Sequence, residues 1–285
     1  MGVNLRAKLL SFLLGLLLCL ILLELGLNLL GLVFLSSQES LNKASLQRNG
    51  GYRILCLGDS TTAVGGSDSW PSQLGILLNS DAPDAKEKGY SVINRGVVLA
   101  DSSLLLSNLE KELAKYQPDM VIMMAGLNDA RKIDNSSFYP LKSLLSRLKT
   151  YRLLQQLSPK TFGTDWIEYD NTQKAYLDSL TISNLNRIHD SLKDRGIKFV
   201  VMQYPMRDLT PLRQVFAPKN GTNNLNDPLF IDNQGIFIQA VADEGYSAYF
   251  VDSFAGDFGH CTRKGNRLIA LNIVNTLKKE GVLPG

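Results

Sequence analysis

The sequence contains little cysteine and little histidine, which narrows the chemistry that it can support. Its 285 residues include three cysteines and two histidines. The cysteines, Cys19, Cys56 and Cys261, form no CxxC pair, so a thiolate zinc site has no support. Cys19 lies in an apolar run, and nothing requires Cys56 and Cys261 to pair. We therefore predict no metal site, and the cysteines leave the redox compartment open.

The chain also lacks a strong excess of charge of either sign. It has 30 basic and 27 acidic residues and a net charge of +3. Proteins that bind nucleic acids by electrostatics carry clustered basic residues. The composition therefore predicts no nucleic-acid partner.

Two common nucleophile and phosphate motifs are missing around Ser60. A GxSxG elbow is excluded because Thr62 stands where the second glycine would be. A phosphate loop is excluded because no lysine follows Gly65 or Gly66.

One long hydrophobic run is present at the N-terminus, over residues 9–35, interrupted by Glu24 and Asn28. As a helix it would be about 40 Å long, more than the ~30 Å hydrocarbon core of a bilayer. A secretory hydrophobic region is usually only ~7–15 residues long, and no A-x-A cleavage site follows. We predict that residues 1–35 form an uncleaved signal anchor, a single transmembrane helix; a cleaved signal peptide is the alternative. Arg6 and Lys8 before the run favour a cytoplasmic N-terminus and an extracytoplasmic remainder.

The rest of the chain divides into a predicted linker, 36–50, and a predicted folded domain, 51–285. Residues 36–50 are polar and lack a strong period. After them, short apolar runs alternate with amphipathic segments. We expect strands at 53–57, 90–94, 120–124, 198–203 and 248–251. We expect helices near 70–79, 103–116, 172–194, 234–243 and 263–280. Alternation of this kind predicts an α/β fold with a parallel sheet covered by helices on both faces.

Four polar motifs follow the predicted strands. Ligands bind beyond the carboxyl ends of the strands in such sheets, so these motifs are candidates for one site. They are Gly58-Asp59-Ser60 after the first strand, Gly96 after the second, Asn128 after the third, and Asp257 with His260 after the last.

These residue types suit nucleophilic catalysis. A serine hydroxyl becomes a good nucleophile when a base takes its proton, and the imidazole of His260 is suited to that task. Asp257, three residues earlier, can orient the imidazole. The N–H groups of Ser60 and Gly96 and the Asn128 amide are candidate oxyanion donors. Each motif alone has a plainer interpretation, since Asp and Ser also favour helix N-caps.

Together, GDS at Ser60, NRG at Gly96, GLND at Asn128 and DFGH at Asp257 and His260 resemble the blocks of the SGNH hydrolases, the GDSL-like esterases. The resemblance covers about residues 51–285. It implies a three-layer α/β/α flavodoxin-like fold and cofactor-free hydrolysis of acyl or O-acetyl esters of lipids or saccharides. It also implies that Ser60, Asp257 and His260 are catalytic and that Ser60, Gly96 and Asn128 form the oxyanion hole.

The resemblance has departures and leaves two alternatives open. The segment after Gly96, VVLADSS, lacks the further glycine of many relatives, and segments 130–175 and 205–235 exceed a minimal core. We expect those two segments to cover the site. O-acyl transfer to an envelope polysaccharide would use the same residues as hydrolysis. A membrane-anchored scaffold without activity is disfavoured because it would not need Ser60, Asn128, Asp257 and His260 together.

The hydrophobic run yields the first testable prediction. Because residues 9–35 are long enough to cross a bilayer, the protein should remain in the pellet when membranes are extracted with alkaline carbonate. Release into the supernatant of a form that begins near residue 36 would show cleavage instead of anchoring.

Overall fold

The computed structural model describes residues 5–49, 51–80, 89–129, 145, 148–151, 171–206, 210–216, 227–251 and 259–284. The chain forms two compact units: Met1–Ser37 with Ile133–Glu168, and Gln38–Lys132 with Tyr169–Gly285. The second unit contains the sheet. Most of segment 130–175, which was expected to cover the site, lies outside the described residues, as does part of 205–235.

The sheet of the second unit has five parallel strands in the order β2-β1-β3-β4-β5. The strands are β1 Tyr52–Gly58, β2 Tyr90–Gly96, β3 Met120–Met124, β4 Lys198–Met202 and β5 Leu229–Ile231. This order is that of flavodoxin-like folds, in which the active edge lies at the carboxyl ends of the strands. Gly58 and Gly96, the last residues of β1 and β2, lie opposite each other in the register.

Both faces of the sheet are buried. In β1, Ile54 and Cys56 belong to one hydrophobic cluster, and Leu55 and Leu57 belong to the other. The alternation arises because successive side chains of a strand point to opposite faces. The apolar run of the strand, rather than a polar alternation, reflects burial on both sides.

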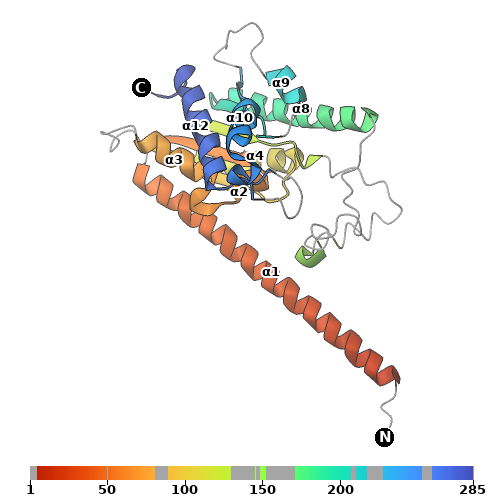
Figure 1. Ribbon diagram of the computed structural model, residues 1–285. Helices are drawn as coiled ribbons and strands as arrows, with labels where there is room; N and C mark the ends of the chain where they lie inside the picture. Colours follow the sequence, from red (N-terminus) through yellow and green to blue (C-terminus); the bar gives the residue numbers. More distant parts are fainter. Residues whose placement is uncertain are drawn as a thin grey trace. The chain divides into compact units, whose positions relative to one another are not determined.

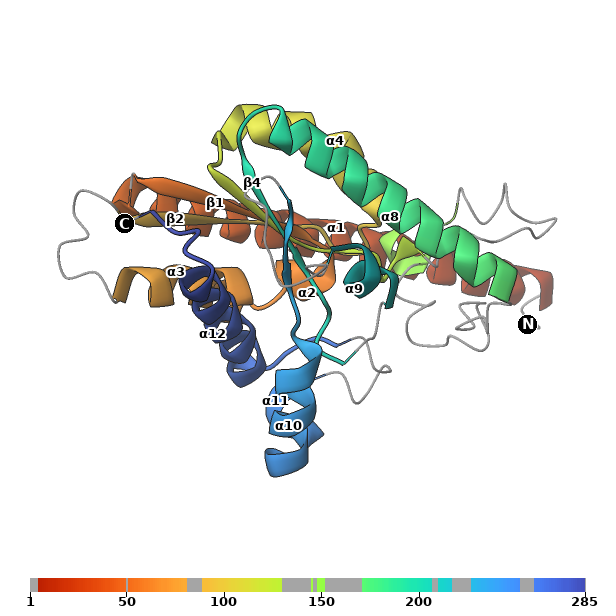
Figure 2. The ribbon, with the colours of Figure 1, turned by 90° about the horizontal axis from the view of Figure 1, so that it is seen from above.

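Helices cover each face, as Figure 2 shows, with α4 and α8 on one side and α3 and α12 on the other. The helices of this unit are α2 Ser60–Ala63, α3 Trp70–Ser80, α4 Ser102–Tyr116, α8 Asn171–Lys193, α9 Thr210–Phe216, α10 Gln234–Glu244, α11 Tyr246–Tyr249 and α12 Arg263–Lys279, with a 3-10 turn at Gly66–Asp68. The predicted three-layer α/β/α fold is confirmed.

One predicted strand is wrong. Residues 248–251 are not the fifth strand, because the helix α11 ends at Tyr249 and only Phe250 forms an isolated antiparallel bridge, with Cys261. The fifth strand is the shorter β5, which pairs with β4. A three-residue strand is too short to show a period, whereas Tyr249 and Phe250 are buried and so give residues 248–251 an apolar pattern.

The N-terminal helix α1 spans Leu5–Asn49 (Figure 1). Its stretch Arg6–Gln47 contains a segment long and apolar enough to cross a membrane. Residues 36–49 of the predicted linker are helical. Amide side chains on one face of this helix have buried partners, described below.

The turn that follows β2 contains a strained residue. The Ala100 N–H donates to the Val97 carbonyl at 3.0 Å, and Leu99 has φ +65°. L-residues other than glycine pay about 1 kcal/mol or more in this left-handed region. Leu99 stands in the segment where the resemblance led us to note a missing glycine.

We expect Leu99→Gly to raise the free energy of unfolding by about 0.5–1 kcal/mol, because glycine adopts a positive φ without strain. The adjacent Val98→Gly, at an exposed residue without a positive φ, should lower it instead. Urea denaturation of the full chain in detergent micelles measures both. Equal destabilisation by the two substitutions would show that the turn stores no strain at Leu99.

Candidate active site

Ser60 begins the short helix α2 directly after β1. The preceding Asp59 is the N-cap of that helix, and its carboxylate accepts from the Thr61 N–H at 2.8 Å and the Thr61 hydroxyl at 2.7 Å. The plainer interpretation of GDS as a helix cap is therefore correct for Asp59, and the cap places Ser60 at the edge of the sheet.

His260 lies against Ser60, although the two are 200 residues apart in the sequence. Its Nε2 is 2.9 Å from the Ser60 Oγ, within the reach needed for proton transfer. The backbone on both sides of His260 is fixed: its carbonyl accepts from the Val251 N–H at 3.0 Å, and the Thr262 N–H donates to the Tyr249 carbonyl at 2.9 Å. Thr262 then caps α12 through Gly265 N–H. Asp257 lies outside the described residues.

Asp59 joins three segments of the site. It is 1% exposed and, besides Thr61, accepts from the Tyr204 hydroxyl at 2.7 Å and from the Asn128 amide at 3.4 Å. Burial raises the pKa of the Asp59 carboxyl, and the hydrogen bonds from Tyr204 and Thr61 oppose that rise. Burial, together with the charge of Asp59, raises the pKa of Tyr204 as well, so its hydroxyl remains a donor.

Tyr204 was not predicted from the sequence. It follows β4 by two residues, in the run QYP, and only its place after a strand could have indicated it. Its hydroxyl links the end of β4 to the turn that carries Ser60.

Asn128 lies in the turn after β3, is 7% exposed, and directs its amide towards the turn after β2. Its Nδ2 donates to the Ala100 carbonyl at 3.0 Å, a better hydrogen bond than the 3.4 Å contact with Asp59. The neighbouring Asp129 is also buried, accepts from the Ser102 N–H at 2.7 Å and binds the Thr181 hydroxyl. These contacts fix the turn that presents the Asn128 amide.

Gly96, predicted as an oxyanion donor, is the last residue of β2. Its N–H donates to the Asn94 Oδ1 at 3.0 Å. A Cβ on Gly96 would lie 2.3 Å from the Ala63 nitrogen, and one on Gly58 would lie 2.6 Å from the Met124 carbonyl oxygen. Glycine is therefore required at both strand ends so that α2 can pack against them.

Within the described part of the chain, no three His, Cys, Asp or Glu side chains gather as a metal ion would require. The two histidines differ in setting: His260 contacts Ser60, whereas His189 stacks on Phe199 at a centroid distance of 6.2 Å.

Comparison with known proteins shows the family of the chain. The model of the GDSL-like lipase/acylhydrolase family matches residues 56–268. No curated protein matches the chain.

Several solved structures are similar to the chain at low sequence identity. A catalytic mutant of Axe2, an acetylxylan esterase from Geobacillus stearothermophilus, has 16% identity and a TM-score of 0.50, over 80% of this chain and 94% of that one. The esterase EstA from Pseudoalteromonas sp. has 16% identity and a TM-score of 0.48, over 81% and 99% of the two chains. The family match includes Ser60, Asn128 and His260. The chain therefore belongs to the GDSL-like lipase/acylhydrolase family, the family of ester hydrolases that its motifs resemble.

Proposed function

We propose that this protein is a serine esterase that hydrolyses carboxylic esters through an acyl-Ser60 intermediate. The observation that carries the proposal is the 2.9 Å contact between the Ser60 Oγ and the His260 Nε2 at the carboxyl edge of the sheet. A serine activated by an adjacent imidazole is the usual arrangement for acyl transfer.

In the first step His260 takes the proton of Ser60 as the oxygen attacks the ester carbonyl, and then gives it to the leaving alcohol. In the second step His260 takes a proton from the water that attacks the acyl carbonyl, and it gives that proton to the Ser60 Oγ as the acyl–oxygen bond breaks. Asp257 is assigned the role of orienting the imidazole and stabilising its cation, because it precedes His260 by three residues in the sequence. Asp59 does not take that role, since its carboxylate is occupied by Thr61, Tyr204 and Asn128.

The developing oxyanion requires donors that are fixed in advance. We assign the Ser60 N–H and the Asn128 amide. The bond from the Asn128 Nδ2 to Ala100 orients the amide, and the longer contact with Asp59 is the one that an oxyanion would replace. Gly96 supports the hole through its close packing on α2, since its N–H is donated to Asn94.

The substrate class is a carboxylic ester, acyl or O-acetyl, of a lipid or a saccharide. O-acyl transfer remains the alternative because a sugar hydroxyl could replace water in the second step with the same residues. The contact between Ser60 and His260 counts against a scaffold without activity. We further propose that α1 anchors the protein as a single-pass helix through residues 9–35, with the domain of residues 51–285 on the extracytoplasmic side, as Arg6 and Lys8 favour.

The test of the nucleophile is Ser60→Ala in the full chain, purified in detergent micelles. Turnover of p-nitrophenyl acetate should fall by roughly 10⁴-fold or more, since the acyl intermediate cannot form. Labelling by a fluorophosphonate should disappear. Ser107→Ala removes an exposed hydroxyl from α4 and serves as the matched control, with wild-type turnover expected. A Ser60→Ala protein that is labelled at the wild-type rate would place the nucleophile elsewhere.

Asn128→Ala should lower kcat by about 10²–10³, the usual effect of losing one oxyanion donor. Asn184 provides the control, because its amide is also buried but donates to Ser102 and Ser103 in α4. Asn184→Ala should destabilise the fold by about 1 kcal/mol and leave kcat near wild type. Steady-state kinetics with p-nitrophenyl esters of graded chain length separate the outcomes: a change in KM alone would make Asn128 a ground-state contact.

A further inference from the structure

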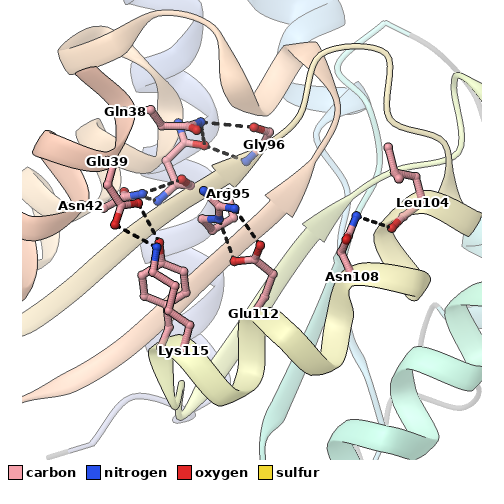
Figure 3. Close-up of polar contacts among 11 residues, drawn as sticks. Gln38, Glu39, Asn42, Arg95, Gly96, Leu104, Asn108, Glu112 and Lys115 are labelled. Atoms are coloured by element: carbon pink, nitrogen blue, oxygen red, sulfur yellow. Dashed lines mark hydrogen bonds and ion pairs between the residues drawn. The ribbon is translucent and has the colours of Figure 1, made fainter. Parts of the chain in front are cut away.

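The last turns of α1 lie along the open edge of the sheet. Among the described residues β2 is an edge strand of the sheet, so its outer N–H and C=O groups face no neighbouring strand there. Gln38 and Asn42 are four residues apart and therefore on the same face of α1, and both are buried against β2 (Figure 3).

Asn42 takes the place of a neighbouring strand at one residue of β2. Its Nδ2 donates to the Asn94 carbonyl at 2.9 Å, and its Oδ1 accepts from the Asn94 N–H at 2.8 Å. Asn42 is 2% exposed. One side-chain amide thus satisfies both outer backbone groups of Asn94, as a strand would.

Gln38, one turn before Asn42 in α1, contacts both Asn94 and Gly96. Its Nε2 donates to the Asn94 Oδ1 at 3.2 Å and to the Gly96 carbonyl at 3.2 Å. It therefore bridges Asn94 and Gly96, the last residue of β2; Figure 3 shows its contact with Gly96.

Asn94 also binds α2, the helix that begins with Ser60. Its Nδ2 donates to the Thr62 carbonyl at 2.9 Å, and its Oδ1 accepts from the Gly96 N–H at 3.0 Å. Thr62 belongs to the same single turn of helix as Ser60. The side chain of Asn94 is held by Gln38, its backbone is held by Asn42, and it binds α2.

We propose that Gln38 and Asn42 are positioning residues for Ser60: they fix Asn94 and the end of β2, and thereby fix the α2 turn that places the nucleophile against His260. This inference rests on the proposed function of Ser60. It gives the end of α1 a role in catalysis in addition to any role in anchoring. Fixed geometry matters because a displacement of about 1 Å at the reacting atoms can cost on the order of 100-fold in rate.

The same helix offers a matched control. Glu39, next to Gln38, docks α1 on α4 instead of β2: its carboxylate accepts from the Lys115 Nζ at 2.8 Å and from the Tyr116 hydroxyl at 3.0 Å. Glu39→Gln weakens the packing of α1 on α4 and leaves the hydrogen bonds of Gln38 and Asn42 to Asn94 unchanged. Lys43→Ala changes an exposed residue of the same turns.

The experiment compares these variants in the full chain in detergent micelles. Asn42→Ala and Gln38→Met should each lower kcat for p-nitrophenyl acetate by about 10- to 100-fold, with KM nearly unchanged. Gln38→Met keeps the length of the side chain and removes only its polar contacts. The rate of fluorophosphonate labelling of Ser60 should fall in parallel. Glu39→Gln and Lys43→Ala should keep wild-type kcat and labelling, even where Glu39→Gln lowers the midpoint of thermal unfolding.

Two outcomes would overturn the inference. One is wild-type kcat in Gln38→Met and in folded Asn42→Ala; the other is an equal loss in Glu39→Gln, which would make the effect one of helix docking in general. Both leave the proposed function standing as long as Ser60→Ala abolishes turnover. Persistence of turnover in Ser60→Ala would instead remove the proposed function, whatever the helix variants show.

Discussion

The site depends on the close packing of α2 against the ends of β1 and β2. Gly58 and Gly96 face each other in the register, and a Cβ on either would collide with the Met124 carbonyl or with the backbone of α2. Because both lack a side chain, the helix that begins at Ser60 can lie directly on the strand ends. The position of the nucleophile is thus set by backbone contact, which is shorter and stiffer than contact through long side chains.

Buried polar groups then tie the remaining strand ends to this helix. Asp59 receives hydrogen bonds from Asn128 after β3 and from Tyr204 after β4, while Asn94 at the end of β2 binds the Thr62 carbonyl. A buried polar group is costly unless it is hydrogen-bonded, so each of these side chains favours one arrangement of its neighbours. The carboxyl edge of the sheet is therefore held by a connected set of hydrogen bonds. Hydrophobic packing alone, being non-directional, would not fix these angles.

Sequence reasoning recovered those features that leave a local pattern. The four longer strands are short, nearly continuous apolar runs, and the helices α3, α4, α8, α10 and α12 are longer amphipathic segments. Ser60 and His260, predicted to belong to one site, are in contact. β5 was missed because three residues show no period, and Tyr204 because its partner, Asp59, is far away in the sequence. The hydrogen bond of the Gly96 N–H could not be predicted for a similar reason. Whether its N–H is available depends on the side chain of Asn94, two residues away, which composition does not reveal.

The segment after the hydrophobic run shows most clearly what hydropathy cannot predict. Residues 36–49 are polar, and polarity suggests a solvated linker, yet Gln38 and Asn42 are buried because their amides match the unpaired backbone of an edge strand. An exposed strand edge invites pairing with other chains, and proteins avoid this by covering it. A helix can cover an edge only if its side chains supply both a donor and an acceptor, which asparagine and glutamine do and apolar residues do not. The compact unit that contains the sheet therefore includes the residues from Gln38 onward, and a chain that began at residue 51 would lose this cover of β2.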